Sequence, residues 1–412
     1  MNVRRSAAVL AAATALTCAA TPAMAASPSP SPTPVIPSGL YGDADPTYDG
    51  VWRQSLALLA QDTVGVRPAD RAVDWLTGQQ CATGAFAAFR ADPAKPCDAK
   101  LMVDSNSTAA AVQALAALGG HDAAVDKAVG WLKSVQNTDG GWGYAPGGAS
   151  DANSTSVVIG ALTAAGEKPA GVAKGGHSPY DALLKLALPC DAGGAFAYQP
   201  DKQGKLTANA DATAAGVLGA LGLGMAPGAG RETDAVCAGT GRATPQQAAA
   251  SGAAYLAKSV AKDNHLMSVL PGAENQPDYG NTADAVVALA AQGGAERAEK
   301  PLAWLEKNSA AWAKQSGPAA YAQLIFAAHA TGSDPRAFGG TDLVAALNAT
   351  GPTPQPAGNN GKTATDEPGD KTDDAKGEDS DDGYGVWWTV GVFLVAGIGI
   401  GFLISGRRKQ RP

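Results

Sequence analysis

The stretch Gln136-Asn137-Thr138-Asp139-Gly140-Gly141-Trp142-Gly143-Tyr144 decides how the rest of the sequence is interpreted. A helical pattern ends at its glutamine, the glycine pair turns the chain, and the tryptophan precedes the next helical pattern. Weaker copies lie at 80–86 (Gln-Cys-Ala-Thr-Gly-Ala-Phe) and at 191–198 (Asp-Ala-Gly-Gly-Ala-Phe-Ala-Tyr). We interpret the motif as a joint between similar helical units, which predicts an array or closed ring of helix pairs.

Between residues 39 and 350 the hydrophobic pattern alternates between two kinds of helix. Residues 107–118 are apolar on almost every side, which is typical of a fully buried helix. In 122–135 the apolar residues fall on one face, as in a helix with one side in water. Six ranges of the first kind (50–61, 107–118, 154–165, 211–223, 283–292 and 318–330) alternate with six of the second kind (69–79, 122–135, 180–188, 245–260, 297–308 and 341–348). The sequence therefore predicts an all-α fold with six inner and six outer helices.

The two ends of the chain predict export and attachment to a membrane. Residues 1–25 combine two arginines, an Ala/Leu/Val run and Ala-Met-Ala, the pattern of a secretory signal peptide. A Ser/Pro-rich linker follows at 26–38, and residues 386–405 form an uncharged stretch long enough to cross a bilayer. The basic tail 406–412 comes next, so we expect a cytoplasmic C-terminus and an extracellular helical domain at 39–350.

Charge is concentrated in one segment of the chain. Residues 351–385 hold nine acidic residues and three lysines, a balance of −6 against −7 for the whole chain. We interpret this segment as a disordered acidic stalk. The helical domain is then close to neutral, which excludes a nucleic-acid partner.

Four cysteines remain once the predicted signal peptide is removed: Cys81, Cys97, Cys190 and Cys237. An even number in an exported chain indicates disulfides. Of the three possible connectivities we favour Cys81 with Cys97 and Cys190 with Cys237, because each would close an insertion between helices. Each bond is expected to contribute about 3 to 4 kcal/mol by restricting the unfolded chain.

The joint at 136–143 resembles the glutamine–tryptophan repeat of squalene and other terpenoid cyclases. The alternating helices resemble the α/α toroid that these enzymes share with protein prenyltransferase β-subunits. The resemblance covers about residues 45–350 and implies an (α/α)6 toroid whose cavity opens at one end. It also implies a structural role, the clasping of outer helices, for Gln136, Gly140, Gly141 and Trp142.

The sequence lacks the motifs that carry catalysis in these families. Cyclases that begin by protonation use an Asp-x-Asp-Asp acid, and adjacent aspartates occur here only in the predicted stalk. Prenyltransferases hold zinc with Asp, Cys and His, whereas the four histidines here are scattered. We therefore predict no catalytic residue and no metal site, and an enzyme is the less favoured interpretation. An acidic side chain pointing into an apolar cavity would favour an enzyme, and Asp211 and Asp284 are the inner-helix candidates.

The chain is also similar to the cobalamin carriers of animals, such as transcobalamin and intrinsic factor, which are secreted, disulfide-bonded toroids. In those carriers polar residues at the starts of inner helices face the ligand. The similarity implies a ligand-binding set of amides at these starts, with neighbouring acids and tyrosines: Asn106, Asn153, Asn209, Asn281, Asp104, Asp151, Tyr144, Tyr198 and Tyr279. Capping of helix N-termini also explains the amides and acids.

From these features we predict a membrane-anchored, cell-surface toroid that binds a small amphipathic ligand, such as a corrinoid, for an uptake system. Because no β-rich domain follows residue 350, a separate lid protein or a transporter would have to cover the ligand. Two alternatives stay open: an enzyme of terpenoid-cyclase or prenyltransferase type, and a structural or protein-docking module. A centre filled by the Ala and Gly residues of the inner helices would favour the last of these.

Overall fold

The computed structural model describes residues 35–234, 236–237, 243–268 and 275–356. These residues form thirteen α-helices, three short 3₁₀ helices and one two-stranded sheet. The prediction of an all-α fold is therefore confirmed. In the described part no helix is both long enough and apolar enough to cross a bilayer. The predicted signal peptide, the transmembrane helix at 386–405 and the basic tail lie outside the described residues.

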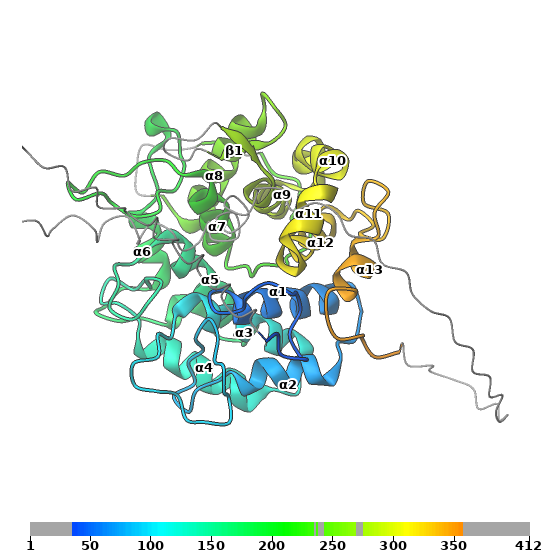
Figure 1. Cartoon of the computed structure of the whole chain (residues 1–412). Coiled ribbons are helices and arrows are strands. Elements are labelled where there is room, and N and C mark those ends of the chain that lie inside the picture. The colour runs from blue at the N-terminus through cyan, green and yellow to red at the C-terminus, as the bar shows by residue number, and fades with distance from the viewer. Residues whose placement is uncertain (1–34, 235, 238–242, 269–274, 357–412) are drawn as a thin grey trace, which may run out of the picture. The chain divides into compact units, whose positions relative to one another are not determined.

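Six helices are buried along most of their length, and they coincide with the six ranges predicted to be inner. They are α1 (Gly50–Thr63), α3 (Ser105–Leu118), α5 (Ala152–Ala164), α7 (Ala210–Leu221), α9 (Tyr279–Gly293) and α12 (Pro318–Thr331). Each packs against the next in this order, and α12 packs against α1, so the contacts close on themselves (Figure 1). Small residues permit this packing, since a Cβ on Gly219 of α7 would lie 2.4 Å from the Ser156 hydroxyl of α5.

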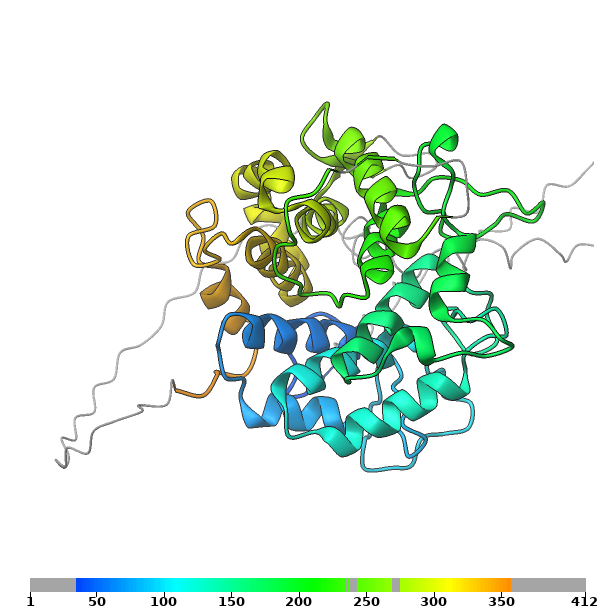
Figure 2. The ribbon, with the colours of Figure 1, turned by 180° about the vertical axis from the view of Figure 1, so that it is seen from behind.

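The remaining helices have one exposed side. They are α2 (Asp70–Gly78), α4 (Asp122–Ser134), α6 (Pro179–Lys185), α8 (Pro245–Val260), α10 (Glu299–Asn308), α11 (Ala310–Ser316) and α13 (Leu343–Asn348). All except α11 fall on the ranges predicted to be outer. In both views α2 and α4 lie outside α1 and α3 (Figures 1 and 2). The short elements are η1 (Pro169–Gly171), η2 (Cys190–Ala192), η3 (Ala295–Ala298), β1 (Leu266–Ser268) and β2 (Gln276–Asp278), the two strands being antiparallel.

The joint at 136–144 connects α4 to α5 and holds the outer layer in place. Trp142 is 1% exposed, and its indole Nε1 donates a hydrogen bond to the carbonyl oxygen of Leu132 in α4 at 2.8 Å. The amide Nε2 of Gln136 donates to the carbonyl oxygens of Gly140 and Val172. Gly140 has φ +93°, and a Cβ there would lie 2.2 Å from a backbone oxygen, so glycine is required.

Four inner helices each carry a threonine that ties the helix to the segment before it, which is one of the three joints or, for α9, strand β1. The threonine hydroxyl lies one turn after the N-cap and accepts a hydrogen bond from a backbone N–H of that preceding segment at 2.9 to 3.1 Å. The four pairs are Thr108 with Phe86, Thr155 with Trp142, Thr213 with Phe196 and Thr282 with Leu266. This contact satisfies a buried N–H that the turn leaves without a partner.

Both favoured disulfides are present, Cys81–Cys97 and Cys190–Cys237, so the predicted connectivity is confirmed. They join residues 16 and 47 positions apart. Because the entropic effect grows with loop length, replacing Cys190 and Cys237 by Ser should lower the free energy of unfolding by about 4 kcal/mol, and replacing the other pair by about 3 kcal/mol. Urea unfolding of the two double variants measures both values. A larger loss from the shorter loop would contradict the entropic account.

Packed structure continues into the segment predicted to be a stalk. Residues 351–356, the only part of 351–385 that the structure describes, lie against the start of the domain. The Tyr41 hydroxyl donates to the carbonyl oxygen of Pro352 at 2.9 Å, and the backbone N–H of Gln355 donates to the carbonyl oxygen of Arg67. Residues 351–356 therefore pack on the domain, which the composition of this segment did not indicate.

Candidate functional site

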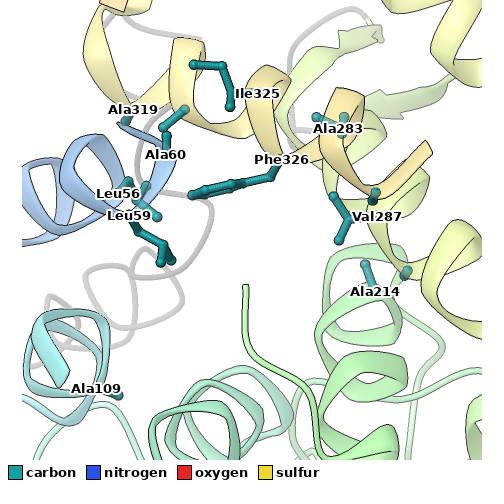
Figure 3. Packing of buried hydrophobic residues seen from close by; sticks show 14 of the residues in the cluster. Leu56, Leu59, Ala60, Ala109, Ala214, Ala283, Val287, Ala319, Ile325 and Phe326 are labelled. Carbon is teal, nitrogen blue, oxygen red and sulfur yellow. The ribbon is translucent and has the colours of Figure 1, made fainter. Parts of the chain in front are cut away.

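A cavity of about 590 Å³ lies among the inner helices, and all six of them contribute to its lining. Its apolar wall includes Leu56 of α1, Val287 of α9 and Phe326 of α12, which Figure 3 shows directed into the space between these helices. This volume is within the range of small-molecule sites. The centre is hollow despite the many Ala and Gly residues, so the feature expected of a purely structural module is not observed.

The loop that follows α7 lines one end of the cavity. Met225, which follows α7 and lines the cavity, donates its backbone N–H to Oε1 of Gln113 at 2.8 Å. Nε2 of Gln113 in turn donates to the carbonyl oxygen of Val157 in α5 at 3.0 Å. Farther along the loop, the N–H of Gly230 donates to the carbonyl oxygen of Ala290 in α9. The loop is thus held by α3 and α9, and α5 holds Gln113 in place.

Three carboxyl groups line the cavity: Asp278, the N-cap of α9, and two on the inner helices, Asp211 at the start of α7 and Asp284 in α9. Burial raises the pKa of Asp284 to about 7, and the negative charge of Asp211 adds to the shift. Nε2 of Gln323 in α12 lies 3.3 Å from both oxygens of the Asp284 carboxyl group. Burial also raises the pKa of Asp211 to about 6, against a 2.7 Å hydrogen bond from Nδ2 of Asn153. Of the two, Asp284 therefore keeps its proton to the higher pH.

These raised pKa values predict how the stability of the domain depends on pH. A carboxyl group whose pKa is higher in the folded than in the unfolded chain, where it is about 3.9, favours folding at low pH and loses this contribution as pH rises through the folded value. The free energy of unfolding should therefore fall between pH 5 and pH 8, and Asp284→Asn should reduce the fall. Urea unfolding of both proteins at pH 5 and at pH 8 measures this fall. An equal fall in the free energy of unfolding in both proteins would contradict the assignment of the raised pKa to Asp284.

The structure brings only part of the predicted ligand-binding set to the cavity. The four amides line it: Asn106, Asn153, Asn209 and Asn281. The two acids instead cap helices, Asp104 at α3 and Asp151 at α5, and burial raises the pKa of each to about 6. The three tyrosines do not line the cavity: Tyr144, Tyr198 and Tyr279. The side chain of Tyr198 forms a hydrogen bond with the carboxyl group of Asp151, and the ring of Tyr279 stacks between those of Trp304 and Trp312.

The predicted set also places Asn209 in α7 alongside Asn106 and Asn153, which is two positions too early. In three inner helices the second residue lines the cavity: Asn106 in α3, Asn153 in α5 and Asp211 in α7. The N-cap of α7 is Asn209, whose side chain accepts from the N–H of Ala212 as Asp104 and Asp151 do in their helices. The order is Asp-x-Asn at the starts of α3 and α5 and is reversed to Asn-x-Asp at the start of α7. This exchange, visible in the sequence, places a carboxyl group where the other two helices place an amide.

The cavity also contains residues that the sequence analysis did not propose. Trp52 of α1, Tyr255 of α8, Trp312 of α11 and Phe326 add four aromatic side chains to the lining. Gln323 is positioned by α12, one helical turn before Phe326. Nothing in the sequence marked these residues as functional, because aromatic residues on a buried helix are the rule in a hydrophobic core.

The chain is similar to known proteins over part of its length. Across 103 residues it is 38% identical to drimenyl diphosphate synthase of Streptantibioticus cattleyicolor, a match that covers 25% of this chain and 18% of the synthase. Among solved structures, ent-copalyl diphosphate synthase from Streptomyces platensis matches 69% of this chain and 50% of its own at 16% identity (TM-score 0.45). A protein from Actinoplanes matches 65% of this chain and 74% of its own at 17% identity (TM-score 0.43). Both TM-scores are too low to assign a function. No family model matches the chain.

The match to drimenyl diphosphate synthase confirms the predicted resemblance to terpenoid cyclases. It overturns the predicted function, a cell-surface module that binds a small amphipathic ligand such as a corrinoid for uptake. The physical reason is that the two acids of the predicted ligand-binding set cap helices and its three tyrosines lie outside the cavity, whereas three other carboxyl groups line it. The preference for a binding protein over an enzyme is likewise unsupported. Export and membrane attachment stay predictions.

Proposed function

We propose that the domain is an (α/α)6 toroid that cyclises an acyclic isoprenoid by protonating one of its double bonds, with the central cavity as active site. The observation that carries the proposal is the Asp284 carboxyl group, which lines a mainly apolar cavity and has a pKa of about 7. A general acid is most effective when its pKa lies near the working pH. The similarity to drimenyl diphosphate synthase supports an isoprenoid as substrate.

In this mechanism Asp284 transfers its proton to a terminal carbon–carbon double bond. The electron pair of that bond forms the new C–H bond, leaving a tertiary carbocation. The next double bond attacks the cation and closes a ring, and a proton finally leaves to the cavity carboxylates. The product is an isomer of the substrate. Burial raises the pKa of Asp284 and the negative charge of Asp211 raises it further, which favours the protonated form of the acid.

The lining suits a cationic intermediate. The faces of aromatic rings attract cations, by about 0.5 to 2 kcal/mol each, and Trp52, Trp312 and Phe326 lie around the cavity. The loop that contains Met225 lines one end of the cavity, where it limits the access of water that would quench the cation. Two acids on neighbouring helices, Asp211 and Asp284, would take the place of the missing Asp-x-Asp-Asp segment.

The origin of the added proton tests the proposal. We would incubate the purified full-length chain in D₂O with farnesol, farnesyl diphosphate and squalene, and analyse the products by gas chromatography and mass spectrometry after phosphatase treatment. Protonation predicts a cyclic isomer that carries one deuterium from the solvent. Cyclic products without deuterium, or no cyclic product from any of the three substrates, would contradict it.

A further inference from the structure

The charge of the cavity lining restricts the substrate that it accepts. Three carboxyl groups belong to the lining, those of Asp211, Asp278 and Asp284, and none of the described residues that line it is Lys, Arg or His. Proteins hold diphosphates with Arg, Lys or bridging metal ions. In the described part of the chain no three His, Cys, Asp or Glu residues are arranged to hold a metal ion. A diphosphate inside this cavity would meet negative charge without compensation.

The cavity lining also includes polar groups that lack hydrogen-bond partners within the described chain. Asn106 of α3 is 2% exposed, and neither its Nδ2 nor its Oδ1 has a hydrogen-bond partner in the described chain. Asn153 of α5 is 4% exposed, and its Oδ1 is also without one, although its Nδ2 binds Asp211. Both side chains line the cavity. Because α9 is three helices away from α3 in the closed order of contacts, Asn106 and Asp284 belong to opposite walls.

Buried polar groups without partners are rare in native proteins, and at a cavity they indicate a place for a ligand atom. Asn106 leaves both a donor and an acceptor free. A hydroxyl group satisfies both at once, because its oxygen accepts from Nδ2 while its proton is donated to Oδ1. An ether or a hydrocarbon cannot donate a hydrogen bond to Oδ1. A diphosphate would place negative charge close to Oδ1 with no cationic side chain among the described lining residues to neutralise it.

We infer that the substrate is an uncharged isoprenoid alcohol whose hydroxyl group binds the side chain of Asn106, beside Asn153, while a double bond of its chain reaches Asp284. The inference rests on the proposed function and adds the chemical class of the substrate. It departs from the matched synthase, whose name specifies a diphosphate.

The test compares three ligands with the same fifteen-carbon skeleton: farnesol, farnesyl diphosphate and farnesene. Equilibrium dialysis against the full-length Asp284→Asn chain, with ligands quantified by mass spectrometry, measures binding without turnover. We expect farnesol to bind at least about 10-fold more tightly than farnesyl diphosphate, with or without Mg²⁺. Introducing Asn106→Ala into this chain should weaken farnesol binding about 10-fold, the usual effect of a hydrogen bond of about 1.4 kcal/mol, and change farnesene binding less than about twofold.

Ser105→Ala in the same chain is the matched control. Ser105 is the neighbouring residue, is 1% exposed, and also has a hydroxyl without a partner, but it does not line the cavity. Both substitutions remove a buried unpartnered group, so both variants should fold, and only Asn106→Ala should change ligand selectivity. Tighter binding of farnesyl diphosphate than of farnesol would overturn the inference, as would an equal loss for all three ligands in Asn106→Ala.

The outcome separates the inference from the proposed function. If farnesyl diphosphate is cyclised with uptake of deuterium and farnesol is not, the substrate class is wrong while the function stands. If farnesol binds selectively through Asn106 but the unmodified chain cyclises no isoprenoid, the function is wrong and the assigned ligand class stands.

Discussion

Replacing Asp284 by Asn should reduce the rate of cyclisation by at least about 100-fold while leaving the fold intact. General acid catalysis typically contributes about 10² to 10⁴ in rate, and an amide of nearly the same shape cannot donate the proton. Burial raises the pKa of this carboxyl group to about 7, which means that its charged form is disfavoured in the fold. Removing the charge should therefore not destabilise the domain. The measurement is the turnover number for whichever isoprenoid gives the deuterated product.

The control for this variant is Asp126→Asn, which removes an exposed carboxyl group on the outer helix α4. It should keep the rate within about twofold, as surface substitutions usually do. Equal activity of the two variants would exclude Asp284 as the acid.

The pH dependence gives a second measurement on the same group. Because the protonated acid is the active form, the rate should fall as pH rises through about 7. The negative charge of Asp211 contributes to the raised pKa of Asp284, so Asp211→Asn should move this fall to lower pH. An unchanged profile in Asp211→Asn would show that the two carboxyl groups do not interact.

Replacing Trp142 by Ala should lower the free energy of unfolding by about 3 to 5 kcal/mol, the range measured for truncation of buried Trp and Phe side chains. Trp142 is 1% exposed, its indole donates to Leu132, and its backbone N–H donates to Thr155. The truncation leaves a cavity and removes the bond between α4 and the joint. We therefore expect the melting temperature to fall by about 10 °C, measured by calorimetry.

Trp142→Phe separates the two contributions. It keeps most of the buried ring but removes the indole N–H, leaving the carbonyl oxygen of Leu132 without its donor. A loss of about 1 to 3 kcal/mol is expected from this single buried partner. If Trp142→Ala costs less than about 1 kcal/mol, the joint does not hold the outer helix in place.

Local physics was enough to predict the helices and their exposure. The twelve predicted ranges fall on helices, because apolar residues with a period of 3.6 occur on one face or on every side wherever the chain is half or fully buried. The glutamine-to-tryptophan joint was also visible as a sequence motif. The two disulfides were indicated by the even number of cysteines and by their positions between helices. The extra helix α11 was not predicted, nor was the packing of residues 351–356 onto the domain.

The candidate site was only partly contained in the sequence. The chain alone shows that Asn106, Asn153, Asp211 and Asp284 are polar residues on buried helices, and capping explains many such residues. Only tertiary packing decides which side chain faces the cavity and which caps its own helix, because one residue of displacement rotates a side chain by about 100°. The raised pKa of Asp284 likewise depends on burial and on Asp211, which is 73 residues away in the chain and on the adjacent helix in the fold. The sequence by itself therefore determined the helices and their buried faces, whereas the fold decided where the acid lies.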